Sequence, residues 1–366
     1  MAVRPLSEVF TARALGVAWN KYEESLGLPP YLGTSFFGLN KKDGLDLKFI
    51  KGRKGLPVAL KASAFDAQAP LRDGIGFSTI ENEMPFYRES YMVTEKEEQE
   101  YATFVGSANI DQANRILSEI MKNPLDLVMG ANVVPERMVW QLLAPPNGVP
   151  EIRVMIDGRD PYVIGYTNDN GADYKSKHYM EITTAADMWS ASATATPLAD
   201  IVAAKKQHRA NGGEVLSTFM MNETTWGWFC AAEDTKKQIL GISAYNDGKR
   251  ISEADIKSYL IETERIEVLV YNGQYFDETG VAKTFIPDGV VSAVSGNVST
   301  LGTIWYGTTP EERSGSLSTG TLSMVNTGVA LYTYTTPHPL QTHCVCSEIV
   351  LPSYENMDSV FVMKVA

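Results

Sequence analysis

The alternation of apolar and polar residues predicts β-strands at intervals along the chain. In segments 45–50 and 56–62, apolar side chains occupy every second position, which would give each strand one apolar face. Short apolar runs bounded by turn residues predict further strands, namely 151–156, 161–166, 214–221, 266–272, 290–296 and 359–366. Residues 151–166 should form a hairpin, and the Asn272-Gly273 pair should end the strand that precedes it.

Apolar residues at three- and four-residue steps predict helices between these strands. The apolar stripe in residues 110–122 predicts one helix. Asn123-Pro124 is a favourable N-cap and first-turn pair, so a second, longer helix is expected over about 124–144. Pro135 lies inside that span and should break or bend the helix. Together, the strands and helices indicate an α+β fold.

Shorter helices are marked by their terminal residues. Thr196-Pro197 should begin a helix that Asn211-Gly212-Gly213 ends, and Ser252 with Asp255 should form a capping box. A short aromatic helix is expected around Trp226. Residues 1–32 predict an amphipathic helix followed by a proline stop.

The segment after residue 62 is too long for an ordinary connection, because loops above about 12–15 residues are uncommon unless they have a function. Its two ends, 56–62 and about 86–94, resemble strands and suggest a two-stranded arm. Isolated two-stranded arms are only marginally stable in water. We therefore expect this arm to lie on something else, such as another subunit.

Composition narrows the classes of protein. The chain has 366 residues, of which 44% are hydrophobic, so it can bury a substantial core. Its apolar runs are much shorter than the roughly 20 residues that a membrane span needs, and charged residues interrupt the N-terminus where a secretory signal would be apolar. The net charge of -12 argues against a surface that binds phosphates, and three cysteines fit a reducing cytosol.

The segment HPLQTHCVC is the best candidate for a metal site, because it contains His338, His343, Cys344 and Cys346. Zinc sites favour two ligands separated by two to four residues, with a second pair at a distance. Here the two cysteines are one residue apart, which in a strand puts both on one face. We therefore interpret the segment as a strand with small apolar thiols.

Other candidates for chemistry are weaker. The sequence NDNGAD at 168–173 lacks the full calcium-loop pattern and is explained by turn formation. Cys230 could be paired with His178 or His208 as a nucleophile and base, but nothing local specifies that pair. Nucleotide-binding glycine motifs are absent from the sequence. The sequence therefore predicts neither an enzyme nor a cofactor or metal site.

Several segments resemble a known family in their order along the chain. They are APLRDGIGFSTIENEMPFYRESY (69–91), ERMVWQLLA (136–144), VYNGQYFDETGVAKTFIPDG (270–289), FIPDGVVSAVSGNVSTLGTIWYGTTPEE (285–312) and the closing DSVFVMKVA. These segments resemble the lambda-type major capsid protein E family of tailed bacteriophages, from about residue 30 to the end.

The resemblance implies the Hong Kong 97-like capsid fold, which is α+β. It implies an N-terminal arm at 1–32 and a peripheral domain at 33–195 and 336–366. The peripheral domain would include an extended E-loop hairpin at about 50–92 and a spine helix at about 124–144. An axial domain would take residues 196–335, and residues 284–312 would build its sheet.

The resemblance also implies a function. The chain would assemble with itself into hexamers and pentamers of an icosahedral phage head that encloses packaged double-stranded DNA, without sequence-specific binding. Its other partners would be a portal protein, a decoration protein and a separate scaffolding protein, since only about thirty residues precede the first strand. The protein would assemble in the host cytoplasm and reside in the virion, with no membrane contact.

Candidate contacts between subunits follow from the same resemblance. On the E-loop they are Arg72, Asp73, Phe77, Arg88 and Glu89, and in the axial domain they are Trp305 and Tyr306. Some relatives join a lysine to an asparagine of a neighbouring subunit, for which Lys54 or Lys61 with Asn356 are weak candidates.

Two alternatives stay open. One is an encapsulin-like compartment of the same fold, which would enclose enzymes in place of DNA. The other is a metal-dependent enzyme that uses His338, His343 and Cys344.

Overall fold

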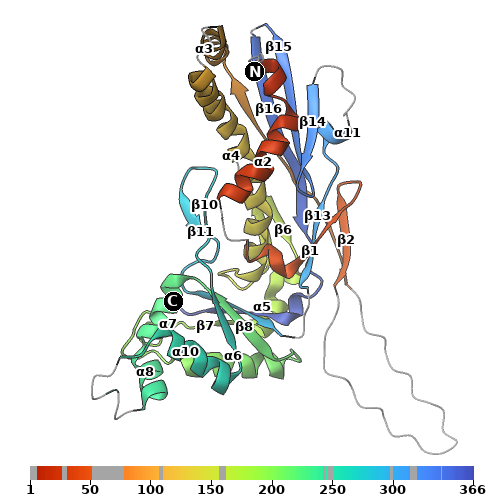
Figure 1. The fold of residues 1–366 in the computed structure, drawn as a ribbon. Coiled ribbons are helices and arrows are strands. Elements are labelled where there is room, and N and C mark those ends of the chain that lie inside the picture. Colours follow the sequence, from red (N-terminus) through yellow and green to blue (C-terminus); the bar gives the residue numbers. More distant parts are fainter. Residues whose placement is uncertain are drawn as a thin grey trace, which may run out of the picture. The chain divides into compact units, whose positions relative to one another are not determined.

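The computed structural model describes residues 6–26, 31–51, 78–106, 110–155, 162–241, 245, 250–296, 300–313, 320–338 and 340–366. The chain divides into two compact units that alternate along the sequence (Figure 1). The first comprises Met1–Leu47, Asn82–Arg137 and Thr303–Ser353, and the second comprises Lys48–Glu81, Met138–Gly302 and Tyr354–Ala366.

The first unit is built on a six-stranded sheet in which β16 (Leu340–Pro352) is the longest strand. One edge of β16 pairs with β15 (Val329–Pro337), which in turn pairs with β14 (Gly320–Val325). The other edge pairs with β4 (Phe86–Val93) and, further along, with β13 (Gly302–Tyr306). The strand β1 (Phe37–Lys41) lies next to β13. All the β16 pairings are antiparallel.

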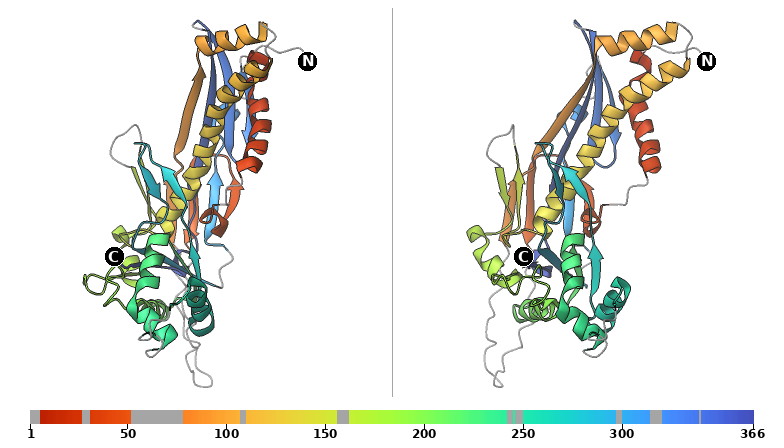
Figure 2. Two further views of the ribbon diagram at one scale, coloured as in Figure 1. Left: turned by 60° about the vertical axis from the view of Figure 1, so that its left-hand side comes forward. Right: turned by 90° about the vertical axis from the view of Figure 1, so that its left-hand side faces the viewer.

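Helices pack on one face of this sheet (Figure 2). They are α1 (Leu6–Val9), α2 (Ala12–Leu26), α3 (Glu95–Gly106) and the N-terminal part of α4 (Ile110–Leu143). The single predicted N-terminal helix is thus two helices, and the backbone N–H of Ala12, the first residue of α2, donates to the side chains of Thr321 and Thr333. This face of the sheet contributes Leu331, Cys344 and Cys346 to the core of the unit.

The helix α4 corrects the prediction of two helices that meet at Asn123-Pro124. It is continuous over 34 residues and contains both Pro124 and Pro135. A proline removes one backbone hydrogen bond, but buried residues continue past Pro124 through Leu125 and Val128, and past Pro135 through Met138, Val139 and Leu142. Packing against the sheet therefore outweighs the cost of the two prolines to the helix. The local sequence carries no information about this packing, so it predicted a break.

The predicted E-loop arm also needs correction. Residues 52–77 lie outside the described part of the chain, and with them the predicted strand at 56–62. The described ends form a two-stranded sheet of β2 (Asp46–Lys51) and β3 (Ser78–Glu83). The predicted returning strand at 86–94 is β4, which makes eight residue pairs with β16 as part of the long sheet. The strand β4 belongs to the long sheet and not to an isolated arm because it pairs with β16, a central strand of that sheet.

The second unit contains a five-stranded sheet in the order β7 (Tyr179–Glu181), β17 (Val360–Lys364), β12 (Val290–Ser295), β8 (Leu216–Met221) and β9 (Glu267–Val270). The outer pairs β7–β17 and β8–β9 are parallel, whereas β12 is antiparallel to both neighbours. All six residues of β12 are buried, so both faces of the sheet are covered.

The second unit contains the helices α5 (Ala172–His178), α6 (Pro197–Ala210), α7 (Glu223–Ala231), α8 (Glu233–Leu240) and α10 (Glu253–Tyr259). Three of these helices, α6, α7 and α10, form where the sequence predicts them, whereas α5 and α8 were not predicted. The capping box of Ser252 and Asp255 is present at the start of α10. The hairpin of β5 (Glu151–Val154) and β6 (Tyr162–Gly165) is also confirmed.

The compact units differ from the predicted axial boundary at 196–335. Residues 303–335 lie in the first unit because β13, β14 and β15 belong to the β16 sheet, whereas β17 at the C-terminus pairs with β12 in the second unit. Segment 284–312 is therefore divided between two sheets. The strands β12 and β13 are close in sequence, and only pairing assigns each to its sheet.

Two histidines meet in the interior of the second unit. The rings of His178 and His208 are 5.6 Å apart, and His178 also lies 3.7 Å from the carboxylate of Asp358. His208 is fully buried, and neither of its ring nitrogens has a hydrogen-bond partner in the described structure. Burial lowers the pKa of His208 to about 4, and the neighbouring His178 acts in the same direction.

The pKa of His208 makes the unfolding free energy depend on pH. Between pH 4 and 6.5 the unfolded chain binds more protons at this site than the folded chain, so stability falls as the pH is lowered through that window. We expect a loss on the order of 2 kcal/mol between pH 7 and pH 5 from this group alone. Urea unfolding at the two pH values measures it.

Other groups titrate in the same range, so the comparison is made between variants. His208→Leu and His208→Gln stay neutral at both pH values and should each lose less stability than the wild type on acidification. His338→Gln, which changes an exposed histidine, should behave as the wild type does. An equal pH dependence in all four proteins would contradict the assignment.

Candidate interaction surface

The face of the long sheet opposite the helices of the first unit is a surface to which several strands contribute side chains. Alternation along β4, β15 and β16 places every second residue there. The side chains that share this face are Phe86, Arg88, Ser90, Met92, Leu322, Met324, Tyr332, Tyr334, His343, Val345 and Ser347. Phe86, Met92 and Met324 are exposed apolar residues, so the face combines apolar area with polar groups.

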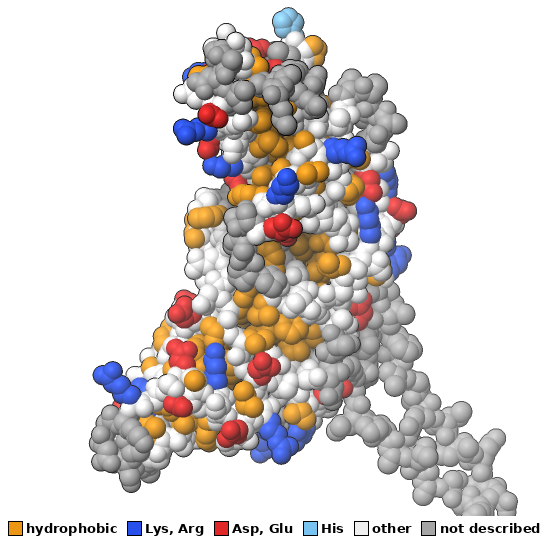
Figure 3. Space-filling view, viewed as in Figure 1, with side chains coloured by type: hydrophobic (Ala, Val, Ile, Leu, Met, Phe, Trp, Pro, Cys, Tyr) orange, Lys and Arg blue, Asp and Glu red, His pale blue; other side chains and the backbone are white. Residues whose placement is uncertain are grey.

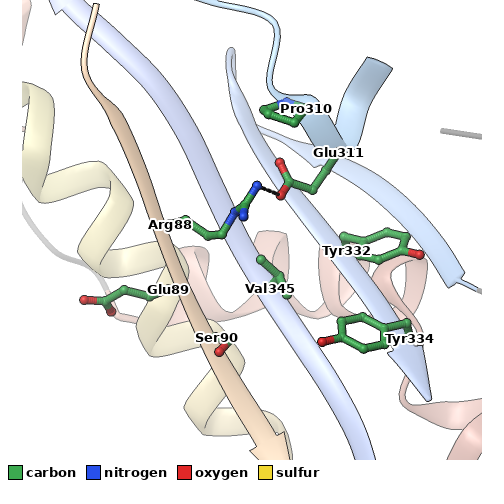
Figure 4. A pocket seen from close by; sticks show the side chains of 8 residues that line it. All are labelled: Arg88, Glu89, Ser90, Pro310, Glu311, Tyr332, Tyr334 and Val345. Atoms are coloured by element: carbon green, nitrogen blue, oxygen red, sulfur yellow. Dashed lines mark ion pairs between the residues drawn. The ribbon is translucent and has the colours of Figure 1, made fainter. Parts of the chain in front are cut away.

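An open hollow of about 460 Å³ lies on this face (Figure 4). At one side of it, the short helix α11 (Pro310–Arg313) brings Glu311 to Arg88 of β4, with a nitrogen–oxygen distance of 2.6 Å. The carboxylate of Glu311 also accepts a hydrogen bond from Ser347 at 2.8 Å. The guanidinium of Arg88 lies 4.6 Å from the ring centre of Phe86. The guanidinium of Arg88 therefore contacts both Glu311 of α11 and the ring of Phe86.

The other side of the hollow is aromatic. Tyr332 and Tyr334 are stacked on neighbouring positions of the same face, with ring centres 5.6 Å apart. Tyr334 is also stacked on His343 at 4.8 Å. Tyrosine supplies a large apolar area together with a hydroxyl group, a combination that is enriched in protein interfaces. The hollow is therefore suited to contact with another macromolecule.

A second hollow, of about 350 Å³, lies between α2 and β14. Its lining mixes Arg13 with small and apolar residues, among them Gly16, Val17 and Met324. On the face shown in Figure 3, apolar side chains form patches between isolated basic and acidic ones. No extended basic cluster is visible in that view, in keeping with the net charge of -12.

The structure separates the residues predicted as contacts on the E-loop. Arg72, Asp73 and Phe77 lie outside the described residues. Arg88 and Glu89 are neighbours on β4 and therefore point to opposite faces, with Glu89 opposite Cys346 in the register. Only Arg88 belongs to the open face. The role of each residue in contacts between subunits stays a prediction.

Trp305 and Tyr306 lie on β13 of the long sheet and not with β12. Trp305 is half-buried, and its indole N–H donates to Ser353 at 3.2 Å. Tyr306 is buried, which raises the pKa of its hydroxyl, and its ring lies against the backbone of Gly328. Of the pair, Trp305 alone reaches the surface of the unit appreciably.

The four residues of the candidate metal segment have separate environments. His338 is exposed after β15, and His343 is stacked on Tyr334. Cys344 and Cys346 point into the helix-covered core, as the strand interpretation predicts, and burial raises the pKa of Cys344 to about 12. Within the described part of the chain, no group of three or more histidine, cysteine, aspartate or glutamate side chains is placed to hold a metal ion.

The remaining candidates for chemistry are likewise part of the local fold. Burial raises the pKa of Cys230 to about 12, and the histidines proposed as its base lie against each other in the core. The segment 168–173 forms a short 3-10 turn at Asp169–Gly171 followed by the start of α5, and Gly171 has a φ of 75°, where a side chain would meet Val149. Asn356 donates to the carbonyl oxygen of Thr300 at 2.8 Å.

Sequence reasoning missed the aromatic side of the hollow and its ion pair. The alternation in VALYTYTTP, residues 329–337, is the signal that could have identified Tyr332 and Tyr334. Glu311 and Arg88 are far apart in sequence, and no local pattern joins them. Glu348 was also missed. It is fully buried on the helix-covered side of β16, and this burial raises the pKa of its carboxyl well above the usual range.

Comparison with solved structures identifies the fold. A prophage protein of E. coli CFT073, described as a capsid protein, matches with a TM-score of 0.58 at 12% identity over 98% of this chain and 99% of that one. A phage-related protein from Bordetella bronchiseptica RB50 matches with a TM-score of 0.50 at 10% identity, covering 97% of each chain. The capsid of cyanophage A-1(L) gives 0.49 at 12% identity over 92% of each chain. A search of curated proteins found no match.

The mixed α+β fold thus matches that of Hong Kong 97-like capsid structures. The sequence model of the family described as Phage major capsid protein E matches residues 11–352. The chain belongs to the Phage major capsid protein E family, as the resemblance of its ordered segments predicts. It is a structural component of the virion capsid and not an enzyme. No helix in the described residues is both long and apolar enough to cross a membrane.

The buried thiols should react slowly in the native protein. The thiolate is the reactive species, and burial raises the pKa of Cys230 and of Cys344 to about 12. At pH 8 we expect a thiol reagent such as DTNB to label the three cysteines at least about 100-fold more slowly in the native state than in urea.

Val202→Cys, which places a thiol on the exposed face of α6, serves as the control and should react at the rate of the unfolded chain. Rapid native labelling of Cys344 at the same rate would contradict the burial of this strand.

Proposed function

We propose that this chain assembles with itself into hexamers and pentamers of an icosahedral phage head, and that the head encloses packaged double-stranded DNA. The observation that carries the proposal is the match of the capsid protein E family over residues 11–352 of a 366-residue chain. The open sheet face with its aromatic hollow supports it, because such a face offers apolar area to a neighbouring copy.

Within this proposal, each unit has an assigned role. The first unit, with its long sheet and most of α4, corresponds to the peripheral domain, and α4 serves as the spine helix. The second unit supplies the axial domain around the five- and six-fold positions. The E-loop begins at β2 and returns at β3, so that β2 and β3 form its base. Arg72, Asp73 and Phe77 contribute contacts from the loop itself.

The charge of the chain sets a condition on assembly. Each copy carries -12, so that neighbouring copies repel one another at long range. Interfaces that bury ~2,000 Å² or more have enough apolar contact to overcome such repulsion. Salt helps, because charges further apart than ~8 Å are largely screened at physiological ionic strength. An acidic wall would also leave the enclosed DNA mobile.

The proposed partners are those that a phage head requires. A separate scaffolding protein would direct the curvature of the shell, and a portal protein would occupy one vertex. A decoration protein would reinforce the outside. Assembly would take place in the host cytoplasm.

Electron microscopy of particles purified from infected or co-expressing cells tests the proposal. We expect closed shells of uniform diameter that contain this chain as the main protein and, when packaging proteins are present, DNA. A chain that remains monomeric with its scaffolding protein would contradict the proposal. Particles that consistently enclose an enzyme would favour an encapsulin-like compartment instead.

Deletion of residues 66–80 tests the contribution of the E-loop. Because the proposal places contacts between subunits in this segment, we expect the deletion to abolish shells while leaving a soluble, folded chain. Microscopy measures the shells, and circular dichroism with a melting curve measures the fold. Normal shells from the deleted chain would contradict the E-loop assignment, whereas an insertion of equal length after Gly106 serves as a control for chain length.

Assembly should also depend on ionic strength. The Debye length grows from ~10 Å at 0.1 M salt to ~30 Å at 0.01 M, so repulsion between copies reaches further at low salt. We expect light scattering to show assembly slowed at least about tenfold between these conditions, as for other electrostatically controlled associations. Sucrose at matched osmolarity is the control, and an unchanged rate would show that repulsion does not limit assembly.

A further inference from the structure

A small hairpin of the second unit is built as a rigid projection. Its strands are β10 (Gln274–Phe276) and β11 (Ala282–Thr284), which pair only with each other among the described strands (Figure 1). It follows the Asn272-Gly273 pair that the sequence predicts as a turn. In the structure residues 271–273 are an irregular connection, which leads the chain out of the five-stranded sheet, because β9 ends at Val270 and does not pair with β10.

The base of the hairpin is anchored by stacked aromatic rings. Trp140 is stacked on Tyr271 with ring centres 5.5 Å apart, Tyr271 on Phe285 at 5.9 Å, and Phe285 on Tyr275 at 4.9 Å. Gly273 is enclosed by this stack, since a side chain there would come within 2.5 Å of the Tyr271 ring. The rings therefore connect the hairpin to α4 and to the core of its unit.

Hydrogen bonds also hold the base of the hairpin. The side chain of Asn272 accepts from the backbone N–H of Glu223 at 2.9 Å and donates to the carboxylate of Glu223 at 2.9 Å. The backbone N–H of Phe285 donates to the carbonyl oxygen of Gly273 at 3.1 Å. Both strands of the hairpin are thus held where they leave the body of the unit.

The turn of the hairpin is held by one carboxylate. Asp277 accepts hydrogen bonds from the backbone N–H of Thr279 at 3.0 Å and of Val281 at 2.9 Å, and from the Thr279 hydroxyl at 2.6 Å. Lys283 lies 2.7 Å from the other oxygen of Asp277. These partners lower the pKa of Asp277 well below its usual range. Gly280 supplies the positive φ of 78° that the turn requires.

This rigid turn presents apolar side chains to solvent. Phe276 is 75% exposed, the largest value among the exposed large hydrophobic residues of the described structure, and Val281 next to the turn is 54% exposed. Single apolar residues on a surface are common and need no explanation. Here, however, the exposed phenylalanine lies on a hairpin whose base and turn are both fixed. A contact made by such a group loses little conformational entropy.

We propose that the tip of the β10–β11 hairpin is a contact element that buries Phe276 against a second copy of this chain. The proposal rests on the proposed function, because a shell built from this chain offers that second copy. On the hairpin, Lys283 offsets the charge of Asp277 and leaves Glu278 as one further acidic group in the turn, so the tip adds little to the repulsion between copies that each carry -12.

Truncation of the Phe276 side chain tests the proposal. Phe276 is exposed and not part of the core, so Phe276→Ala should leave the melting temperature of the unassembled chain unchanged. The substitution should raise the protein concentration needed for shell formation at least about tenfold, as expected when an interface anchor is removed. Val202→Ala, at a 46% exposed position on α6 of the same unit, is the matched control and should assemble as the wild type does.

The outcomes separate this proposal from the proposed function. If the wild type forms shells and Phe276→Ala assembles equally well, the proposed role of the hairpin is wrong and the capsid function is unaffected. An equal defect in both variants would also overturn it, because the effect would not be specific to the hairpin. Failure of the wild type to form shells with its scaffolding protein would overturn both.

A photo-crosslinking amino acid at position 276 identifies the occupant. In assembled shells we expect crosslinked dimers of this chain, with the crosslinked peptide identified by mass spectrometry, and no such dimers from the unassembled protein. Crosslinks to scaffolding or decoration protein alone, or none in the shell, would overturn the proposed occupant.

Discussion

The two-sided alternation of β16 is the constraint on which the first unit depends. This strand is thirteen residues long and pairs along both edges, so its odd and even positions face different environments over its whole length. One side places Cys344, Cys346 and Glu348 beneath the helices. The other side places His343, Val345 and Ser347 on the face that carries the hollow. A shift of the register by one residue would exchange the two sets and would expose the core.

The second unit is organised by a different rule. The strand β12 is buried on both faces and is flanked by β8 and by β17 from the C-terminus. The last strand of the chain therefore completes a sheet whose first strand is β7, at residues 179–181. Each unit consequently needs segments from distant parts of the sequence. Neither can be completed until the chain has passed through both.

The surface features follow from these two cores. The helix-covered core leaves one face of the long sheet without a long helix, and an ion pair and stacked tyrosines hold that face in shape. Aromatic stacking at its base and one carboxylate at its turn hold the β10–β11 hairpin. In both places the molecule holds apolar area in a fixed geometry at its surface. For a member of a capsid protein family, apolar groups that are already held in one geometry lose less conformational entropy when further copies bind to them.

The sequence by itself determined the α+β class, most of the short elements of the second unit and the strand character of the Cys344–Cys346 segment, because capping residues, turns and alternation are local signals. The order of its segments also determined the family. Only the tertiary structure decided that α4 continues through Pro124 and Pro135, that β4 joins β16, and that β12 and β13 belong to different sheets. It likewise brought Arg88 to Glu311 and His178 to His208. The physical reason is common to these cases: burial against residues far away in sequence outweighs local preference, and no short stretch of the chain carries information about its distant partners.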